Sequence, residues 1–292
     1  MNHKILKEIA GVSVGALILI TGASAMPQDI NPVKTSVAHA SDSVEQTRIV
    51  VPKGYTADSI EDWHDDPTNV HLTGKLQRLS RMGMISNRFY DQQISDSREV
   101  DLNNLSSSDQ YELSQYALAL INSIRTQLGL PKFEYTASAQ SFANDIAKAY
   151  NEDNWSDYRG HDISAINRVA KQHGLIQNGN EYEDLGGFTA SLGHRYTTVA
   201  QAKQDIYFNI KQAAFGGFYY HNNQESDKEN LAYYTEWNHA NDLFTGDYSK
   251  EFALSLSYLR VTDPNNNTHG ITSSHCICID SENIENKSLY ER

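Results

Sequence analysis

Residues 109–128, DQYELSQYALALINSIRTQL, carry the clearest structural signal in the chain. The serines at 106–108 supply N-cap residues before this stretch, and Gly129 with Pro131 supplies a stop after it. The pattern predicts a long amphipathic helix with one buried face. Its apolar residues recur at the spacing of a single helix face: Leu113, Tyr116, Ala117, Leu120, Ile121, Ile124 and Leu128.

Three more helices are predicted downstream. The first follows Thr136, the second begins at an Asp162 cap and ends at Gly174, and the third covers residues 199–213.

The C-terminal part has the pattern of strands. Residues 252–258 alternate between apolar and small polar side chains, which is typical of a half-buried strand. The run DPNNN at 263–267 is a turn signal, and residues 270–279 predict the returning strand of an antiparallel hairpin. Helices followed by a hairpin, without βαβ alternation, indicate an α+β fold over residues 109–281.

The segments that flank this domain are expected to lie outside its core. Residues 1–40 resemble a signal peptide, with Lys4 and Lys7 before an uncharged run, and with A-x-A sites that predict cleavage after residue 25 or 40. An uncleaved membrane anchor is the alternative. Residues 41–108 predict a polar, partly ordered arm with a short helix at 72–85, and residues 282–292 predict a flexible tail.

Composition limits the classes of function. The chain has 292 residues with 37 acidic and 24 basic side chains, a formal charge of −13, and a charge of this sign disfavours nucleic acid as a partner. The acidic run at 58–66 is expected to be a solvated surface segment. Cys276 and Cys278 alternate with apolar residues, so they are expected to face one side of a strand as inert thiols; a strained bridge and a weak metal site are the alternatives.

Histidines and carboxylates in loops beside the helices are the candidate site residues. The sequence contains no G-x-S-x-G, H-E-x-x-H, P-loop or dinucleotide motif, which disfavours the corresponding hydrolases and nucleotide-binding proteins. What remains includes His161, Glu183 and His239. Two imidazoles and a carboxylate suit a divalent cation or general acid/base chemistry, whereas surface and helix-cap roles are the alternative.

An ordered series of segments resembles a known family. The stretches VDLNNL at 100–105, ELSQYA at 112–117, LINSIR at 120–125, FANDIA at 142–147 and GHDI at 160–163 are similar to the surface exclusion proteins of Gram-positive bacteria, of the PgrA type. The series extends through DIY and NHA to the terminal hairpin, and the resemblance covers residues 50–279.

The resemblance implies a divergent CAP domain, the fold of cysteine-rich secretory and pathogenesis-related proteins. That fold is an α-β-α sandwich whose groove carries two histidines and two acids. The resemblance places His161, Glu183 and His239 in the groove and implies Zn²⁺ or a similar cation there. Asn209 stands where the second acid is expected, so Asp205 or Glu236 is the candidate fourth ligand. Asp184 stands where the family has Asn after the groove acid.

Three functions follow as expectations. The first is a secreted, non-enzymatic protein that hinders contact between mating cells and has a component of the envelope or of a neighbouring cell as its partner. The others are a binding protein for a lipid or wall polymer and a metal-dependent hydrolase of the CAP type. Because the sequence shows no L-P-x-T-G signal, we expect it to be released or held to the wall non-covalently, with no membrane span after signal cleavage.

Overall fold

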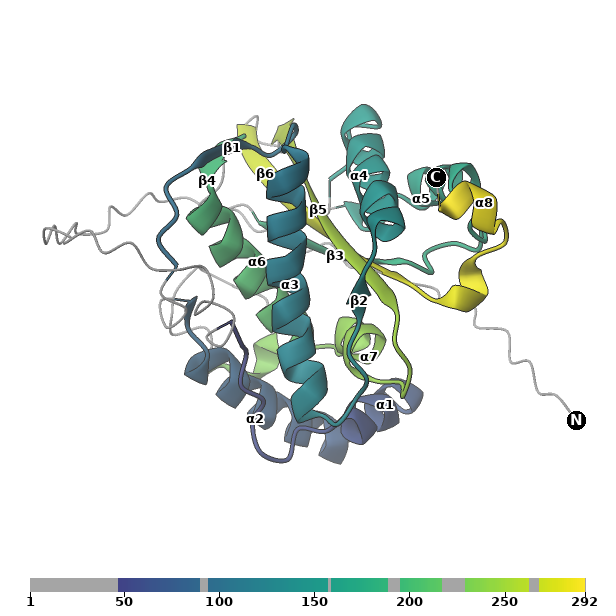
Figure 1. Ribbon diagram of the computed structural model, residues 1–292. Coiled ribbons are helices and arrows are strands. Elements are labelled where there is room, and N and C mark those ends of the chain that lie inside the picture. Colours follow the sequence, from purple (N-terminus) through teal and green to yellow (C-terminus); the bar gives the residue numbers. More distant parts are fainter. Residues whose placement is uncertain are drawn as a thin grey trace, which may run out of the picture.

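The computed structural model describes residues 47–89, 94–156, 159–188, 195–216, 229–262 and 268–291. The predicted signal peptide, residues 1–40, lies outside them. No helix within these ranges combines the length and apolarity needed to cross a membrane. The elements, drawn in Figure 1, are α1 (Ala57–Asp65), α2 (Val70–Ser86), β1 (Glu99–Asp101), α3 (Ser107–Gln127), β2 (Glu134–Tyr135), α4 (Ala137–Glu152), α5 (Ile163–Gln172), β3 (Glu183–Phe188), β4 (Tyr196–Thr198), α6 (Val199–Ala214), α7 (Asn238–Phe244), β5 (Glu251–Thr262), β6 (Thr268–Ile279) and α8 (Lys287–Tyr290).

A four-stranded mixed sheet forms the centre of the fold, with the order β2-β5-β6-β3. The predicted antiparallel pairing of the hairpin is confirmed, since β5 and β6 pair over their full lengths; the turn predicted at 263–267 lies outside the described residues. The short β2 runs parallel to β5, and β3 runs antiparallel to β6 at the other edge. A separate two-stranded sheet joins β1 to β4.

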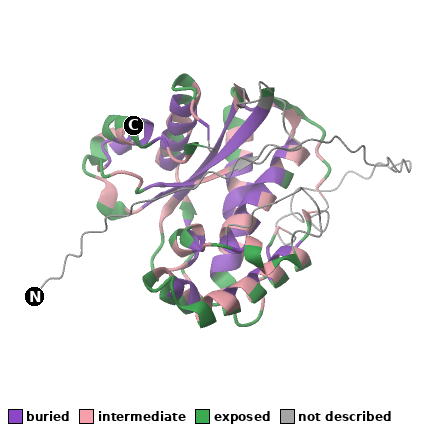
Figure 2. Ribbon diagram, turned by 180° about the vertical axis from the view of Figure 1, so that it is seen from behind, coloured by how far each residue is buried: buried purple, intermediate pink, exposed green. Residues whose placement is uncertain are grey.

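Helices cover both faces of the central sheet, which confirms the α+β prediction (Figure 1). Alternate residues of β5 divide between two apolar clusters, because side chains along a strand point to opposite faces. Leu254 packs in the cluster built with α3, α6 and α7, and Ala253 packs in the cluster built with α4 and α5. Among the described residues, β5 and β6 are buried over most of their lengths (Figure 2).

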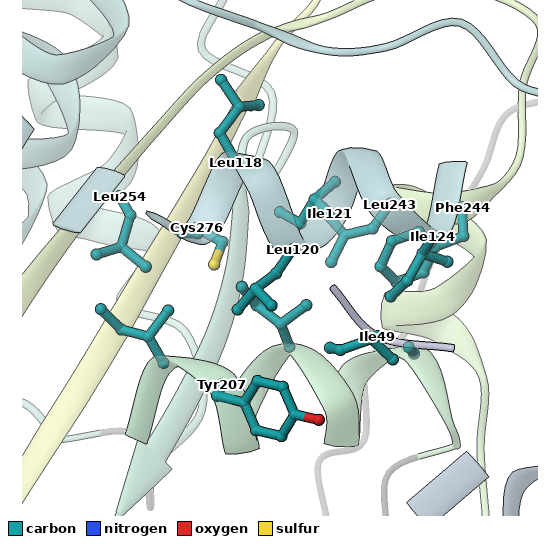
Figure 3. Packing of buried hydrophobic residues seen from close by; sticks show 14 of the residues in the cluster. Ile49, Leu118, Leu120, Ile121, Ile124, Tyr207, Leu243, Phe244, Leu254 and Cys276 are labelled. Carbon is teal, nitrogen blue, oxygen red and sulfur yellow. The ribbon is translucent and has the colours of Figure 1, made fainter. Parts of the chain in front are cut away.

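The predicted amphipathic helix is α3, and its stripe forms the middle of the larger cluster. Ser106 caps the helix, since its side chain accepts a hydrogen bond from the Asp109 N–H. Leu120, Ile121 and Ile124 are fully buried. Figure 3 shows these three side chains facing residues of α6, α7 and the segment before α1.

Residues 47–89 differ from the expected polar arm, because they pack into the same cluster. Ile49, Ile60 and Leu76 are fully buried, and the rings of Trp63 and Trp237 meet edge to face at 5.0 Å. The helix predicted at 72–85 is present as α2. The few apolar residues of this segment are spread through polar sequence, so its composition resembles that of an arm although α1 and α2 each present an apolar face to the core.

The C-terminal segment also differs from the expected flexible tail. Tyr290 of α8 is buried and donates a hydrogen bond to the Glu251 carboxylate at 2.7 Å. The Gly174 carbonyl accepts hydrogen bonds from the backbone N–H groups of Glu285 and Asn286. Gly174 has φ +69°, and a Cβ there would lie 2.6 Å from the Asn286 carbonyl oxygen, so glycine is required at this contact.

Candidate functional site

The edge strand β3 carries two adjacent acids on opposite faces of the sheet. Glu183 is the register partner of Ile277, which belongs to the cluster under α4 and α5. Asp184 is the partner of Cys276, which belongs to the cluster under α3 and α6. Each acid therefore meets a different set of helices.

Glu183 receives three hydrogen bonds. The Nδ1 atoms of His161 and His275 lie 2.8 Å from Oε2 and 2.6 Å from Oε1 respectively, and the Tyr150 hydroxyl donates to Oε2 at 2.5 Å. The Glu183 side chain itself has no exposed surface. Both carboxylate oxygens are thus engaged inside the protein.

Local structure holds His161 in place. Gly160, with φ +73°, allows the turn that precedes it, and Asp162 caps α5 by accepting from the Ala165 N–H at 3.0 Å. The Asp162 N–H in turn donates to the Tyr150 hydroxyl at 2.8 Å. The predicted cap at Asp162 is confirmed, and it fixes the chain directly after the histidine.

The environment of Glu183 favours its charged form. Burial by itself would raise the pKa of this carboxyl, but the hydrogen bonds from His161 and His275, together with the attraction of these two groups, outweigh burial and lower the pKa to about 2. Glu183 is therefore a carboxylate throughout the neutral range.

The hydrogen-bonded chain continues to a serine. Nε2 of His275 lies 2.8 Å from the Ser257 hydroxyl, so hydroxyl, imidazole and carboxylate follow one another as in an acyl-transfer site. Ser257 is 1% exposed and His275 is fully buried, so neither group meets solvent. Sequence reasoning did not assign these two residues to the site. The alternation of β5 and β6 was the available signal, since it puts His275 on the same face as Ile277.

His239 pairs with the other acid. It lies in the first turn of α7, and its Nδ1 is 2.9 Å from Oδ1 of Asp184. Desolvation would lower the pKa of this imidazole, but the hydrogen bond and charge of Asp184, aided by the nearby carboxylates of Glu236 and Asp242, raise the pKa to about 9. The imidazole is one-third exposed and carries a positive charge at neutral pH.

The structure brings together only two of the three predicted metal ligands. His161 meets Glu183, whereas His239 meets Asp184 on the other face of β3. Both oxygens of Glu183 already accept hydrogen bonds. In the described ranges, no group of three or more His, Cys, Asp or Glu side chains is placed to hold a metal ion.

The candidate fourth ligands and the cysteines lie elsewhere. Asp205 is buried on α6, and Glu236 accepts a hydrogen bond from the Asn238 N–H at 2.6 Å. Cys276 and Cys278 are buried free thiols in one cluster, as expected for strand thiols, and burial raises the pKa of both.

Helices on both faces of a mixed sheet form a CAP-like fold, as a comparison with solved structures shows, and this part of the prediction is confirmed. Among solved structures the chain is similar to the CAP domain of Enterococcal PrgA, with a TM-score of 0.59 and 21% sequence identity, over 84% of this chain and 91% of that one. No family model and no curated protein matches the sequence.

Proposed function

We propose that this protein is an extracellular module that acts by contact, as surface exclusion proteins do, and hinders the approach of a mating cell. Its partner would be a component of the cell envelope or of the neighbouring cell. Export by the leader predicted at residues 1–40, and release or non-covalent retention at the wall, belong to the same proposal. The fold-wide similarity to the CAP domain of Enterococcal PrgA supports it.

One observation carries the proposal: the reactive side chains at the candidate site are paired with one another. His161 is held by Glu183, and His239 by Asp184. The two pairs tie the start of α5 and the start of α7 to the same edge strand. The hydroxyl of Ser257 is hydrogen-bonded to the His275 imidazole, as a catalytic serine would be, but it lies inside the protein. These groups suit a brace that fixes the shape of a surface better than a centre that meets a substrate.

A conjugation assay tests the proposal. Recipient cells that display the protein are mated with donors of a conjugative plasmid, and transfer frequency is compared with that of recipients displaying an unrelated domain at equal surface density. We expect fewer transconjugants with the protein. Equal transfer frequency at verified display would contradict the proposal, and release of wall fragments by the purified protein would favour the hydrolase instead.

A further inference from the structure

Four polar side chains lie between α6 and the sheet, and each has a buried atom without a hydrogen-bond partner. These atoms are Oδ2 of Asp205, Nδ2 of Asn209, Oγ1 of Thr272 and Oγ of Ser274. None of the four residues is more than 7% exposed. Since buried polar groups in proteins are nearly always hydrogen-bonded, four unpartnered atoms on two facing elements need an explanation. We refer to these four residues as the polar cluster.

The pattern of the two elements puts the four side chains on facing surfaces. Asp205 and Asn209 are one turn apart on α6, and Thr272 and Ser274 are two apart on β6, so each pair shares one face. A Cβ at Gly186 of β3 would lie 2.6 Å from Oδ1 of Asn209, and Gly186 is the register partner of Ser274. The Asn209 amide thus lies directly over the strand pair that contains Ser274.

The direction of α6 places Asp205 toward Thr272. Residues 102 and 103 connect the start of α6 to the sheet. The Leu102 N–H donates a hydrogen bond to the Arg195 carbonyl just before α6. The Asn103 side-chain amide donates to the carbonyl of Tyr258 in β5, which is the register partner of Thr272 in β6. The start of α6 therefore lies at the Thr272 end of β6. Four helical residues advance about 6 Å, and two strand residues advance about 6.6 Å, so the two pairs match in spacing.

Within the described residues, no cationic side chain is paired with Asp205. Its one hydrogen bond comes from the Gln201 amide to Oδ1 at 3.5 Å. The lysines of the same helix are engaged elsewhere: Lys203 pairs with Glu112, and Lys211 donates to the carbonyls of Met84 and Asn87. Burial raises the pKa of Asp205 to about 8, partly offset by the Gln201 hydrogen bond. Near neutral pH the group is therefore mostly protonated, and a cation that displaces the proton would compensate the charge of the buried carboxylate.

We propose that the polar cluster binds a small hard cation, Ca²⁺ being the representative, through side-chain oxygens. Asp205, Thr272 and Ser274 offer oxygens directly, and a half-turn of the Asn209 amide, whose two ends are nearly isosteric, offers a fourth. Oxygen ligands of this kind are those that Ca²⁺ takes, with water completing its shell.

The polar cluster shares no residue with the pairs at Glu183 and Asp184, and this proposal does not depend on the proposed function. With a single carboxylate, the affinity is expected to be weak, in the range of about 0.1–1 mM found for extracellular Ca²⁺ modules.

Calorimetry and thermal unfolding of the purified protein test the site. We expect saturable heat with CaCl₂, and at about ten times the dissociation constant the unfolding equilibrium constant is expected to fall about tenfold. NaCl at matched ionic strength separates binding from screening. Asp205→Asn, which keeps shape and removes charge, is expected to abolish the heat, while Asp65→Asn at an exposed position of α1 is expected to leave it unchanged.

Thr272→Val provides a second test that leaves the carboxyl group of Asp205 in place, and we expect it to weaken Ca²⁺ binding. Two outcomes would overturn the proposal: a parent protein without saturable Ca²⁺ heat, or Asp205→Asn and Thr272→Val variants that fold and bind Ca²⁺ as the parent does. An Asp205→Asn variant that is more stable than a Ca²⁺-insensitive parent would indicate a protonated acid with ordered water instead.

Discussion

The replacement Glu183→Gln tests whether the buried carboxylate braces the fold. Gln keeps the size of the side chain but removes the charge that His161, His275 and Tyr150 bind. The pKa of Glu183 is lowered from 4.5 to about 2, and each pKa unit corresponds to about 1.4 kcal/mol, so the carboxylate contributes about 3 kcal/mol at neutral pH. Removing one partner of a buried ion pair has a similar cost, about 3–5 kcal/mol.

The lowered pKa of Glu183 predicts how its contribution to stability changes with pH. Because the pKa is lower in the folded than in the unfolded protein, the contribution of Glu183 is fully present above about 4.5 and is lost as pH falls toward 2. Urea unfolding at pH 7 is expected to show Glu183→Gln less stable by about 3 kcal/mol, and the difference is expected to shrink below pH 4.5.

A neighbouring acid supplies the control. Glu181→Gln makes the same chemical change at an exposed position two residues away, and it is expected to alter stability by less than about 0.5 kcal/mol. If Glu183→Gln behaves like Glu181→Gln at pH 7, with the same pH profile as the parent, the carboxylate is not the brace described above.

Two further predictions concern the other face of the sheet. NMR titration of His239 is expected to give a midpoint near pH 9. The stabilising effect of the imidazolium charge is expected to be fully present below about pH 6.5 and to be lost as pH rises toward 9. Asp184→Asn is expected to lower the midpoint, and a midpoint near 6.5 in the parent would contradict the pairing of His239 with Asp184. Gly83→Ala in α2 would put a Cβ 2.5 Å from the Phe215 ring, and the overpacking is expected to lower the free energy of unfolding by about 1–3 kcal/mol. In the control Gly74→Ala of the same helix, the new Cβ meets nothing closer than 3.5 Å, so this variant is expected to raise the free energy of unfolding by up to about 1 kcal/mol. Equal effects of the two variants in denaturant unfolding would show that α2 does not pack on the core.

Periodicity predicted the elements whose burial follows from local sequence. The stripe that contains Leu113 and Ile124 became α3, and the alternation at 252–258 became β5. The packing of residues 47–89 was not predictable in this way, because Ile60 and Trp63 are buried by contacts with residues far along the chain.

The candidate site was predicted in composition but not in arrangement. The histidines and carboxylates in loops beside the helices, together with the family resemblance, pointed to His161, Glu183 and His239, and all three take part in buried or half-buried pairs. Which face of β3 each histidine meets depends on strand register, a tertiary property. Asp184, not Glu183, therefore became the partner of His239.

Replacing both histidines while keeping their hydrogen bonds tests the central claim most directly. Asn at positions 161 and 239 places an amide N–H near the position of Nδ1, so the double variant His161→Asn with His239→Asn retains a donor for each acid but removes both imidazoles. Transfer frequency into recipients displaying this folded variant is the measurement. A protein that acts by contact is predicted to exclude donors as well as the parent does, and loss of exclusion by a variant with parental stability would show that the imidazoles themselves carry the function.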